Sequence, residues 1–218
     1  EDRVRATRNR VAGRVELAAI YSVGLLEMDT YVNRFQDQYP DTEVHLDYLH
    51  PDEVYSRVIN GESDLGIVSF PRDGGEISCI PWREEEMVVA INPDHRLANT
   101  RSIPWSSLNN EALIGFSSGL IIQKMVDRWL RRAGVTIAKL HEFDNIENIK
   151  RAVEIGPGLA LLPAPTIRRE IEAGTIRAVT LEADKQFRPI GLIHRRNKSM
   201  STAAQKLVDL LIDNRGNG

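Results

Sequence analysis

The sequence contains a single cysteine, Cys79, among its 218 residues. One thiol cannot form a disulfide within the chain, so a reducing compartment, the cytoplasm, is the simplest expectation. We interpret Cys79 as a free structural thiol rather than a reactive one. No apolar run approaches the roughly 20 residues that a membrane-spanning helix needs, so we expect no membrane partner. No export signal is visible, and a composition of 42% hydrophobic and 27% charged residues is typical of a soluble globular protein.

The sequence also has no excess of positive charge, since its net charge is −3 and its pI is about 6.0. This opposes a nucleic-acid-binding surface over the chain as a whole, and no helix-turn-helix, zinc-finger or basic-zipper pattern is present. The exception is a basic opening segment, which we interpret as a solvated helix tail or connector, with a nucleic-acid arm as the alternative. Its arginines are Arg3, Arg5, Arg8, Arg10 and Arg14.

Catalytic and cofactor signatures are missing as well. The chain has no Ser-His-Asp set, HExxH motif, P-loop or Cys/His group at metal-ligand spacing, so we expect no enzyme, no metal and no cofactor. Two acidic runs, residues 83–86 and Asp52-Glu53, are interpreted as solvated turns.

What the sequence does contain is the order strand, helix, strand, helix, strand, twice over. In the first half, Pro40 ends the first helix, while His50-Pro51-Asp52 opens the second and Gly61 stops it. The run at 65–68 is apolar throughout, which fits a strand buried on both faces. The expected elements are a strand at 14–20, a turn at 21–24, a helix through 28–39, a strand at 44–48, a helix at 51–60 and a strand at 65–68.

The second half repeats the architecture without repeating the sequence. Ser117-Ser118-Gly119 forms the turn before a long amphipathic helix that Gly134 stops, and Asp144 or Asn145 caps the next helix, which Gly156 closes. The expected elements are a strand at 113–116, a helix through 122–133, a strand at 137–143, a helix through 146–153 and a strand at 159–162 followed by Pro163.

Two further strands predict how the halves are connected. A strand at 87–91 leaves the first half and one at 189–194 returns to it, so the chain crosses twice and forms a hinge. A last helix, about 202–212, is expected to pack back on the first lobe. Two such units facing each other would direct several helix N-termini into one cleft, which suits small polar or anionic molecules.

Four stretches resemble the effector-binding domain of LysR-type transcriptional regulators. The first is Gly-Glu-Ser-Asp-Leu-Gly-Ile-Val at 61–68, and the others lie at 35–40, 86–97 and 156–163. The order and spacing of these stretches are specific, and the resemblance as a whole covers about residues 13–213. The turn at 21–24, Tyr-Ser-Val-Gly, departs from the family's Ser or Thr pairs, and Arg96 stands where the family often has Pro.

The resemblance implies the fold class α/β, with two Rossmann-like lobes and a hinge, like a type 2 periplasmic binding protein. The expected division is the end of a linker helix at 1–13, lobe I at 14–91 with 192–218, and lobe II at 92–191. It further implies a DNA-binding domain upstream and absent from this chain, so that DNA is contacted only through that domain. A homodimer is expected, with tetramers in the full-length protein, in which the helix around 28–39 packs on the partner's helix around 123–132.

The expected partner is a small polar or anionic effector bound at the starts of helices and the ends of strands. Plain helix capping by Ser and Asn, a turn role for His50 and a core role for Phe70 are the alternatives. An extracytoplasmic solute-binding protein of the same fold is the alternative function. The candidate effector-binding residues are Ser22, Val23, Gly24, His50, Pro51, Ser69, Phe70, Ser117, Ser118, Gly119, Asn145 and Pro163.

Overall fold

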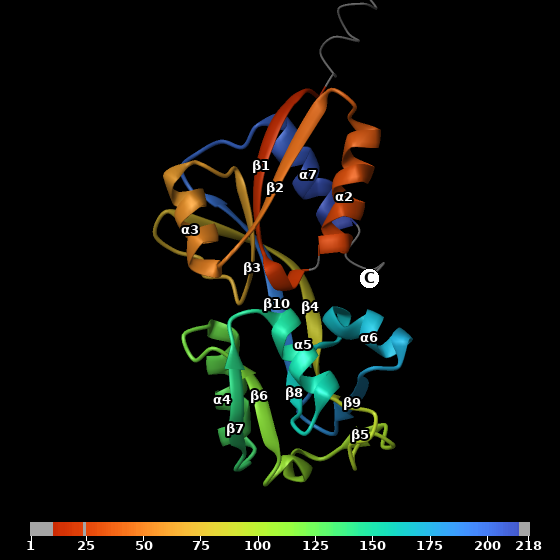
Figure 1. The fold of residues 1–218 in the computed structure, drawn as a ribbon. Coiled ribbons are helices and arrows are strands. Elements are labelled where there is room, and N and C mark those ends of the chain that lie inside the picture. Colours follow the sequence, from red (N-terminus) through yellow and green to blue (C-terminus); the bar gives the residue numbers. More distant parts are fainter. Residues whose placement is uncertain (1–10, 24, 214–218) are drawn as a thin grey trace, which may run out of the picture. The chain divides into compact units, whose positions relative to one another are not determined.

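A computed structural model describes residues 11–23 and 25–213 of the chain, which divides into two compact units (Figure 1). Unit 1 takes the chain up to Arg83 and again from Ile190, and unit 2 runs from Glu84 to Pro189. Both crossings fall inside strands, β4 (Ile77–Ile91) and β10 (Phe187–Arg195). The boundaries expected at residues 91 and 192 fall within these same two strands. Residues 1–10 of the expected linker helix and the candidate residue Gly24 lie outside the described residues.

Unit 1 is a sheet covered by helices on both faces. Its strand order is β2-β1-β3-β10, in which the first three strands are parallel and β10 runs antiparallel to β3. Figure 1 shows α3 on one face and α2 with α7 on the other. Besides parts of β4 and β10, its elements are β1 (Gly13–Ile20), the 3-10 helix η1 (Tyr21–Val23), α2 (Leu25–Gln38), β2 (Thr42–Leu49), α3 (Pro51–Asn60), β3 (Leu65–Ser69) and α7 (Thr202–Asp213).

The sequence pattern of unit 1 is confirmed element by element. Gly61 ends α3 with φ 77°, a left-handed conformation that glycine adopts without steric cost, as its position after the helix predicts. All five residues of β3 are buried, which confirms a strand covered on both faces. The last helix packs on α2 and β1, so it does return to the first unit.

Asp64, within the stretch at 61–68, ties the start of β3 to β1. Its carboxylate accepts a hydrogen bond from the Glu16 backbone N–H at 3.0 Å, and its own N–H donates to the Glu16 carbonyl at 2.8 Å. The pair lies one residue before the parallel register of Leu17 with Leu65 begins. Asp64 therefore starts the β1–β3 ladder and fixes its register.

Unit 2 contains two groups of strands. Strand β4 pairs antiparallel with both β8 and β9, while β6 and β7 form a parallel pair. A single parallel bridge, Leu113 with Leu159, joins β6 to the start of β8. The elements are β5 (Ser102–Ile103), η2 (Trp105–Leu108), β6 (Ala112–Phe116), α4 (Ile121–Arg132), β7 (Ala138–Phe143), α5 (Ile146–Ile155), β8 (Ala160–Pro163), η3 (Ala164–Ile167), α6 (Arg168–Ala173) and β9 (Arg177–Leu181).

The interpretation of residues 83–86 as a solvated turn is wrong. These residues lie inside β4, and Glu85 is only 3% exposed. Its carboxylate accepts from the guanidinium of Arg188 in β10, which is fully buried, with an Nε to Oε2 distance of 2.9 Å. Because the partner lies 103 residues away, nothing near Glu85 in the sequence indicates that its charge is neutralised in the interior. Asp52 and Glu53 form the first turn of α3 instead of a solvated turn.

We predict that Arg188→Met destabilises the protein by about 3–5 kcal/mol, because it removes the buried guanidinium that pairs with the buried Glu85 carboxylate. Urea unfolding followed by circular dichroism measures this loss. The matched control is the double variant Arg188→Met with Glu85→Leu, which removes both charges and should recover most of the loss. A single variant as stable as the wild type would show that the pair is not required.

Candidate functional site

In unit 1, the candidate residues follow the carboxyl ends of three adjacent parallel strands. Ile20 and Leu49, the last residues of β1 and β2, are partners in the parallel register, and Ala19 is partnered with Ile67 of β3. The segments after these strands therefore leave the sheet at one edge, where α/β sheets bind ligands. The candidates brought to this edge are Ser22, Val23, His50, Pro51, Ser69 and Phe70.

His50 and Pro51 form the start of α3. His50 is the N-cap, and its Nδ1 accepts from the Asp52 backbone N–H at 3.4 Å, while Pro51 occupies the first helical position. Proline suits this position because its missing N–H is not needed there. The geometry supports the alternative that His50 is a capping and turn residue.

The other candidates at this edge differ in accessibility. Val23 is part of the unit 1 core, so only its backbone remains for a ligand. Ser69 is 9% exposed and lies opposite Ile190, the first residue of the returning segment of unit 1. Phe70 is partly exposed with φ 47°, a left-handed conformation that is uncommon for bulky residues and recurs at ligand sites.

Sequence reasoning missed Arg72, two residues beyond Phe70. Its backbone N–H donates to the Tyr55 hydroxyl at 2.9 Å, and its guanidinium carbon lies 5.0 Å from the centre of the Tyr55 ring. Tyr55 lies one turn after Pro51 on α3, so both contacts hold Arg72 beside the first half of that helix. Within the described residues Arg72 has no acidic partner, which leaves its charge available to an anion. The sequence does not indicate this role, because a single arginine in a loop belongs to no motif or spacing that marks a binding residue.

In unit 2, two of the candidate turns also share one edge. Phe116 and Phe143, the last residues of β6 and β7, are partners, and the Ser117 N–H donates to the Phe143 carbonyl at 2.8 Å. This brings the turn at 117–119 beside Asn145. Pro163 ends β8 and is partnered with Met87 of β4, close to where the chain enters unit 2. Its ring is buried and its carbonyl accepts from the Thr166 hydroxyl at 2.6 Å, so Pro163 shapes the backbone here.

The starts of α4 and α5 differ in capping. Asn145 caps α5, since its side chain accepts from the Glu147 N–H at 2.8 Å, which supports the capping alternative for this residue. Helix α4 instead has Leu120 at its N-cap and no side-chain cap. Within the described residues, the hydroxyls of Ser117 and Ser118 make no hydrogen bond, so the capping alternative is wrong for both. The α4 N-terminus therefore keeps free N–H groups next to two free hydroxyls.

Comparison with known proteins supports the resemblance seen in the sequence. A model of the LysR substrate binding domain matches residues 8–216. The chain belongs to this family. YeiE of Escherichia coli (strain K12), described as an uncharacterized HTH-type transcriptional regulator, is 26% identical over 197 residues, which cover 90% of this chain and 67% of YeiE. CysL of Bacillus subtilis (strain 168), an HTH-type transcriptional regulator, is 24% identical and covers 87% of this chain and 63% of its own length.

Solved structures of LysR regulatory domains confirm the two-lobed α/β fold, like that of periplasmic binding proteins. The regulatory domain of Synechocystis PCC6803 CcmR, solved in complex with 2-PG, has a TM-score of 0.84 at 27% identity and covers 94% of this chain and 98% of its own. The effector binding domain of QuiR, solved with shikimate, has a TM-score of 0.83 at 18% identity and the same coverage, a likeness of fold alone. The LysR domain spans between 60% and 68% of the length of the curated relatives.

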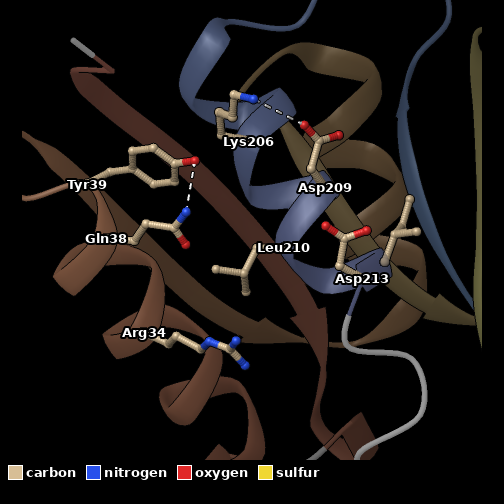
Figure 2. A pocket seen from close by; sticks show the side chains of 8 residues that line it. Arg34, Gln38, Tyr39, Lys206, Asp209, Leu210 and Asp213 are labelled. Atoms are coloured by element: carbon tan, nitrogen blue, oxygen red, sulfur yellow. Dashed lines mark hydrogen bonds and ion pairs between the residues drawn. The ribbon is translucent and has the colours of Figure 1, made fainter. Parts of the chain in front are cut away.

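A groove of about 570 Å³ in unit 1 of the LysR domain offers a different position for a ligand. It lies between the C-terminal end of α2 and α7, near Tyr39, which precedes β2, so it is at the amino edge of the sheet. Figure 2 shows Gln38 hydrogen-bonded to Tyr39 and Lys206 paired with Asp209. Its charged groups are of both signs, and none of its lining residues was a candidate. Nothing in the groove selects an anion.

Cys79 has the environment of a structural thiol. Burial, followed by the charge of Asp73, raises the pKa of Cys79 above its ordinary value, which keeps the thiol protonated and fits a structural cysteine. No group of three metal-ligating side chains occurs among the described residues of the LysR domain. In the same part of the chain no helix has the length and apolarity to cross a membrane.

We predict that Asn145→Ala lowers the free energy of unfolding by about 1 kcal/mol, because it removes a helix cap. The double variant Ser117→Ala with Ser118→Ala should stay within about 0.5 kcal/mol of the wild type, because neither hydroxyl has a partner in the described fold. Chemical unfolding of the three proteins side by side tests this. A loss in the serine variant as large as that of Asn145→Ala would mean that the serines cap α4 after all.

Proposed function

We propose that this LysR domain binds a small anionic or polar effector through the carboxyl edges of its two units, and that α4 provides the strongest contact. The observation that carries the proposal is the uncapped α4 N-terminus with the free hydroxyls of Ser117 and Ser118. A single cleft shared by both units remains a prediction. The proposed contacts are Ser117, Ser118, Gly119 and Asn145 with Pro163 in unit 2, and Ser22, Val23, Gly24, His50, Pro51, Ser69 and Phe70 in unit 1.

The chemistry of the α4 start favours an anion. The first N–H groups of a helix have no partner inside it, and the helix dipole adds about half a positive charge there. An anionic group accepts hydrogen bonds from these N–H groups and is attracted by the partial positive charge. Serine hydroxyls supply further donors. That CcmR was solved with 2-PG and QuiR with shikimate supports a small organic acid as the effector class.

We include Arg72 in the proposed site of unit 1. The α3 N-terminus already has His50 as its cap, so it offers fewer free donors than that of α4. Arg72 supplies a full positive charge beside this helix, held over Tyr55. The guanidinium is planar and carries several donors, which suits a carboxylate or phosphate group.

We predict that isothermal calorimetry and thermal shift against shikimate, 2-PG, other organic acids, amino acids, sulfate and phosphate will show binding of at least one compound. Ser117→Ala with Ser118→Ala, and separately Arg72→Gln, should weaken that binding by roughly fivefold or more, as expected for a loss of 1–2 kcal/mol. Arg128→Gln is the matched control, because Arg128 is an exposed arginine on α4 that is not among the proposed effector contacts.

Two results would count against these assignments. If no compound raises the melting temperature of the wild type, the anionic-effector proposal fails. If the wild type binds a compound and a variant binds it equally well, the substituted residues do not belong to the site. An effect of Arg128→Gln as large as that of Arg72→Gln would point to a general charge effect.

For the whole protein we propose a cytoplasmic transcriptional regulator without enzymatic activity, in which a separate domain contacts DNA and effector binding shifts the conformational equilibrium by its differential affinity. Relatives named as HTH-type transcriptional regulators support this role. The same relatives do not favour an extracytoplasmic solute-binding protein. We keep the division expected from the sequence, with lobe I at 14–91 and 192–218 and lobe II at 92–191, as part of this proposal.

We also propose that the domain forms homodimers, and that the full-length protein forms tetramers, through α2 of one copy and α4 of another, and we include strand β7, which follows α4, in this interface. In support, β7 pairs only with β6 among the described strands, and residues 138–142 along it are exposed. Leu140 in this strand is 41% exposed and Ile121 at the start of α4 is 38% exposed. An exposed edge strand of this kind is normally covered or protected.

We predict that Leu140→Asp shifts the domain from dimer to monomer, because it places a charge in an apolar contact. Sedimentation velocity at several concentrations measures this shift. Leu140→Ala, which shortens the side chain without adding charge, should have a smaller effect. A wild-type domain that is monomeric at all concentrations, or a dimer that Leu140→Asp leaves intact, would remove β7 from the interface.

A further inference from the structure

Gln123 is fully buried at the third position of α4, three residues after the N-cap Leu120. Burial of an amide is costly unless its groups are hydrogen-bonded, and here both groups are. The Oε1 atom accepts from the Phe116 backbone N–H at 2.8 Å, and the Nε2 atom donates to Oδ1 of Asp127, one turn further along α4, at 2.8 Å.

The bond to Phe116 closes the segment that contains Ser117, Ser118 and Gly119. In a capping box, a Gln at the third helical position reaches back to the N-cap N–H. Gln123 reaches past the N-cap to the last residue of β6 instead. The turn is therefore held at both ends by α4 itself, and it needs no side-chain cap at Leu120.

On the edge of β6 away from β7, no described strand provides an acceptor for the Phe116 N–H. The Ile114 N–H, two residues earlier and thus on the same edge of β6, donates to the Leu159 carbonyl at 2.8 Å. The only β6–β8 bridge in the described chain is Leu113 with Leu159. Gln123 thus replaces a strand partner for a residue that is only 4% exposed, where an unpaired N–H would be destabilising.

Gly115 makes room for this arrangement. A Cβ atom at this position would lie 2.8 Å from Oε1 of Gln123, closer than such contacts occur. The φ of Gly115 is not in the left-handed region, so the glycine is needed for space and not for its backbone conformation. Strand β6 and the Gln123 amide are fitted to each other.

We infer that Gln123 is the positioning residue of the effector-binding turn: its amide holds Phe116 so that the Ser117 and Ser118 hydroxyls and the α4 N–H groups converge on one ligand. This inference rests on the proposed function of the turn. Gln123 is itself inaccessible and does not contact the effector. Asp127 orients the Gln123 amide by accepting from Nε2, and Lys139 of β7 in turn donates to the other Asp127 oxygen at 3.4 Å.

The test exchanges the amide and the carboxylate between positions 123 and 127. Gln123→Met removes both hydrogen bonds at similar volume, and Gln123→Glu places a carboxylate against Asp127. The double variant Gln123→Glu with Asp127→Asn restores both bonds, because the introduced carboxylate accepts from the Phe116 N–H and from the new amide, whose oxygen still accepts from Lys139. The net charge of the pair is unchanged in the double variant.

Two readouts are compared, the affinity for shikimate, 2-PG and inorganic phosphate, and the hydrogen exchange of the amides of 116–120. We expect both single Gln123 variants to weaken binding about tenfold or more, which corresponds to roughly 1.4 kcal/mol, and to accelerate exchange in this segment. Exchange of the β8 amides should be unchanged, as an internal reference for folding. The double variant should return affinity to within about threefold of the wild type.

Unchanged affinity and exchange in a folded Gln123→Met protein would overturn the inference, as would a double variant no better than Gln123→Glu. If the methionine variant does not fold, the comparison of the single Gln123→Glu variant with the double variant still tests whether Gln123 positions the turn. If the wild type binds none of the three compounds, that result counts against the proposed function, and exchange at 116–120 alone then decides whether Gln123 holds the turn.

Discussion

The register of the parallel strands is the constraint on which the candidate site depends. In a parallel ladder the carboxyl ends of neighbouring strands come to the same edge, and each following helix begins there. The partnering of Ile20 with Leu49 in unit 1 and of Phe116 with Phe143 in unit 2 fixes this alignment. A slip of one residue would move every polar turn relative to its neighbour and reverse which side chains face the core. The hydrogen bonds between Asp64 and Glu16 oppose such a slip at the start of β3.

The helices α3, α4 and α5 all begin at these edges, but they are not equivalent. His50 and Asn145 use their side chains for capping, which satisfies donors that a ligand would otherwise bind. Helix α4 has an apolar N-cap and leaves its donors free. A protein that only needed a stable helix would gain from a Ser or Asp in place of Leu120, so the missing cap is a local cost in stability. Binding sites commonly carry such costs, because groups satisfied within the fold are no longer available to a ligand.

Most of the fold was predictable from the sequence because its signals are local. Alternating and helical apolar spacing predicted the repeated strand-helix-strand-helix-strand order of both halves, but not β5, α6, β9 or the first ten residues of β4. Gly61 and Asn145 predicted helix ends through their own conformational and capping preferences. The buried role of Glu85 was not predictable, because it depends on Arg188 in a strand far along the chain. Arg72 and Gln123 were missed for the same reason. Arg72 gains its position from Tyr55, and Gln123 has the spacing of an ordinary helix residue until β6 is placed against it.

The polar contacts of α4 also connect the turn to the exposed strand β7. The contacts run from the Phe116 N–H through Gln123 and Asp127 to Lys139, whose ammonium also donates to Glu142 at 3.2 Å. Burial lowers the pKa of Lys139, but the bonds to Glu142 and Asp127 outweigh this effect and raise it, so the lysine stays charged and Asp127 keeps its counter-charge. The Gln123 amide is buried, whereas Lys139 and Glu142 lie on the exposed part of β7, so these contacts run from the interior of unit 2 to its surface. The turn that we assign to effector binding and the strand that we assign to the dimer interface are therefore held by one hydrogen-bonded network within unit 2.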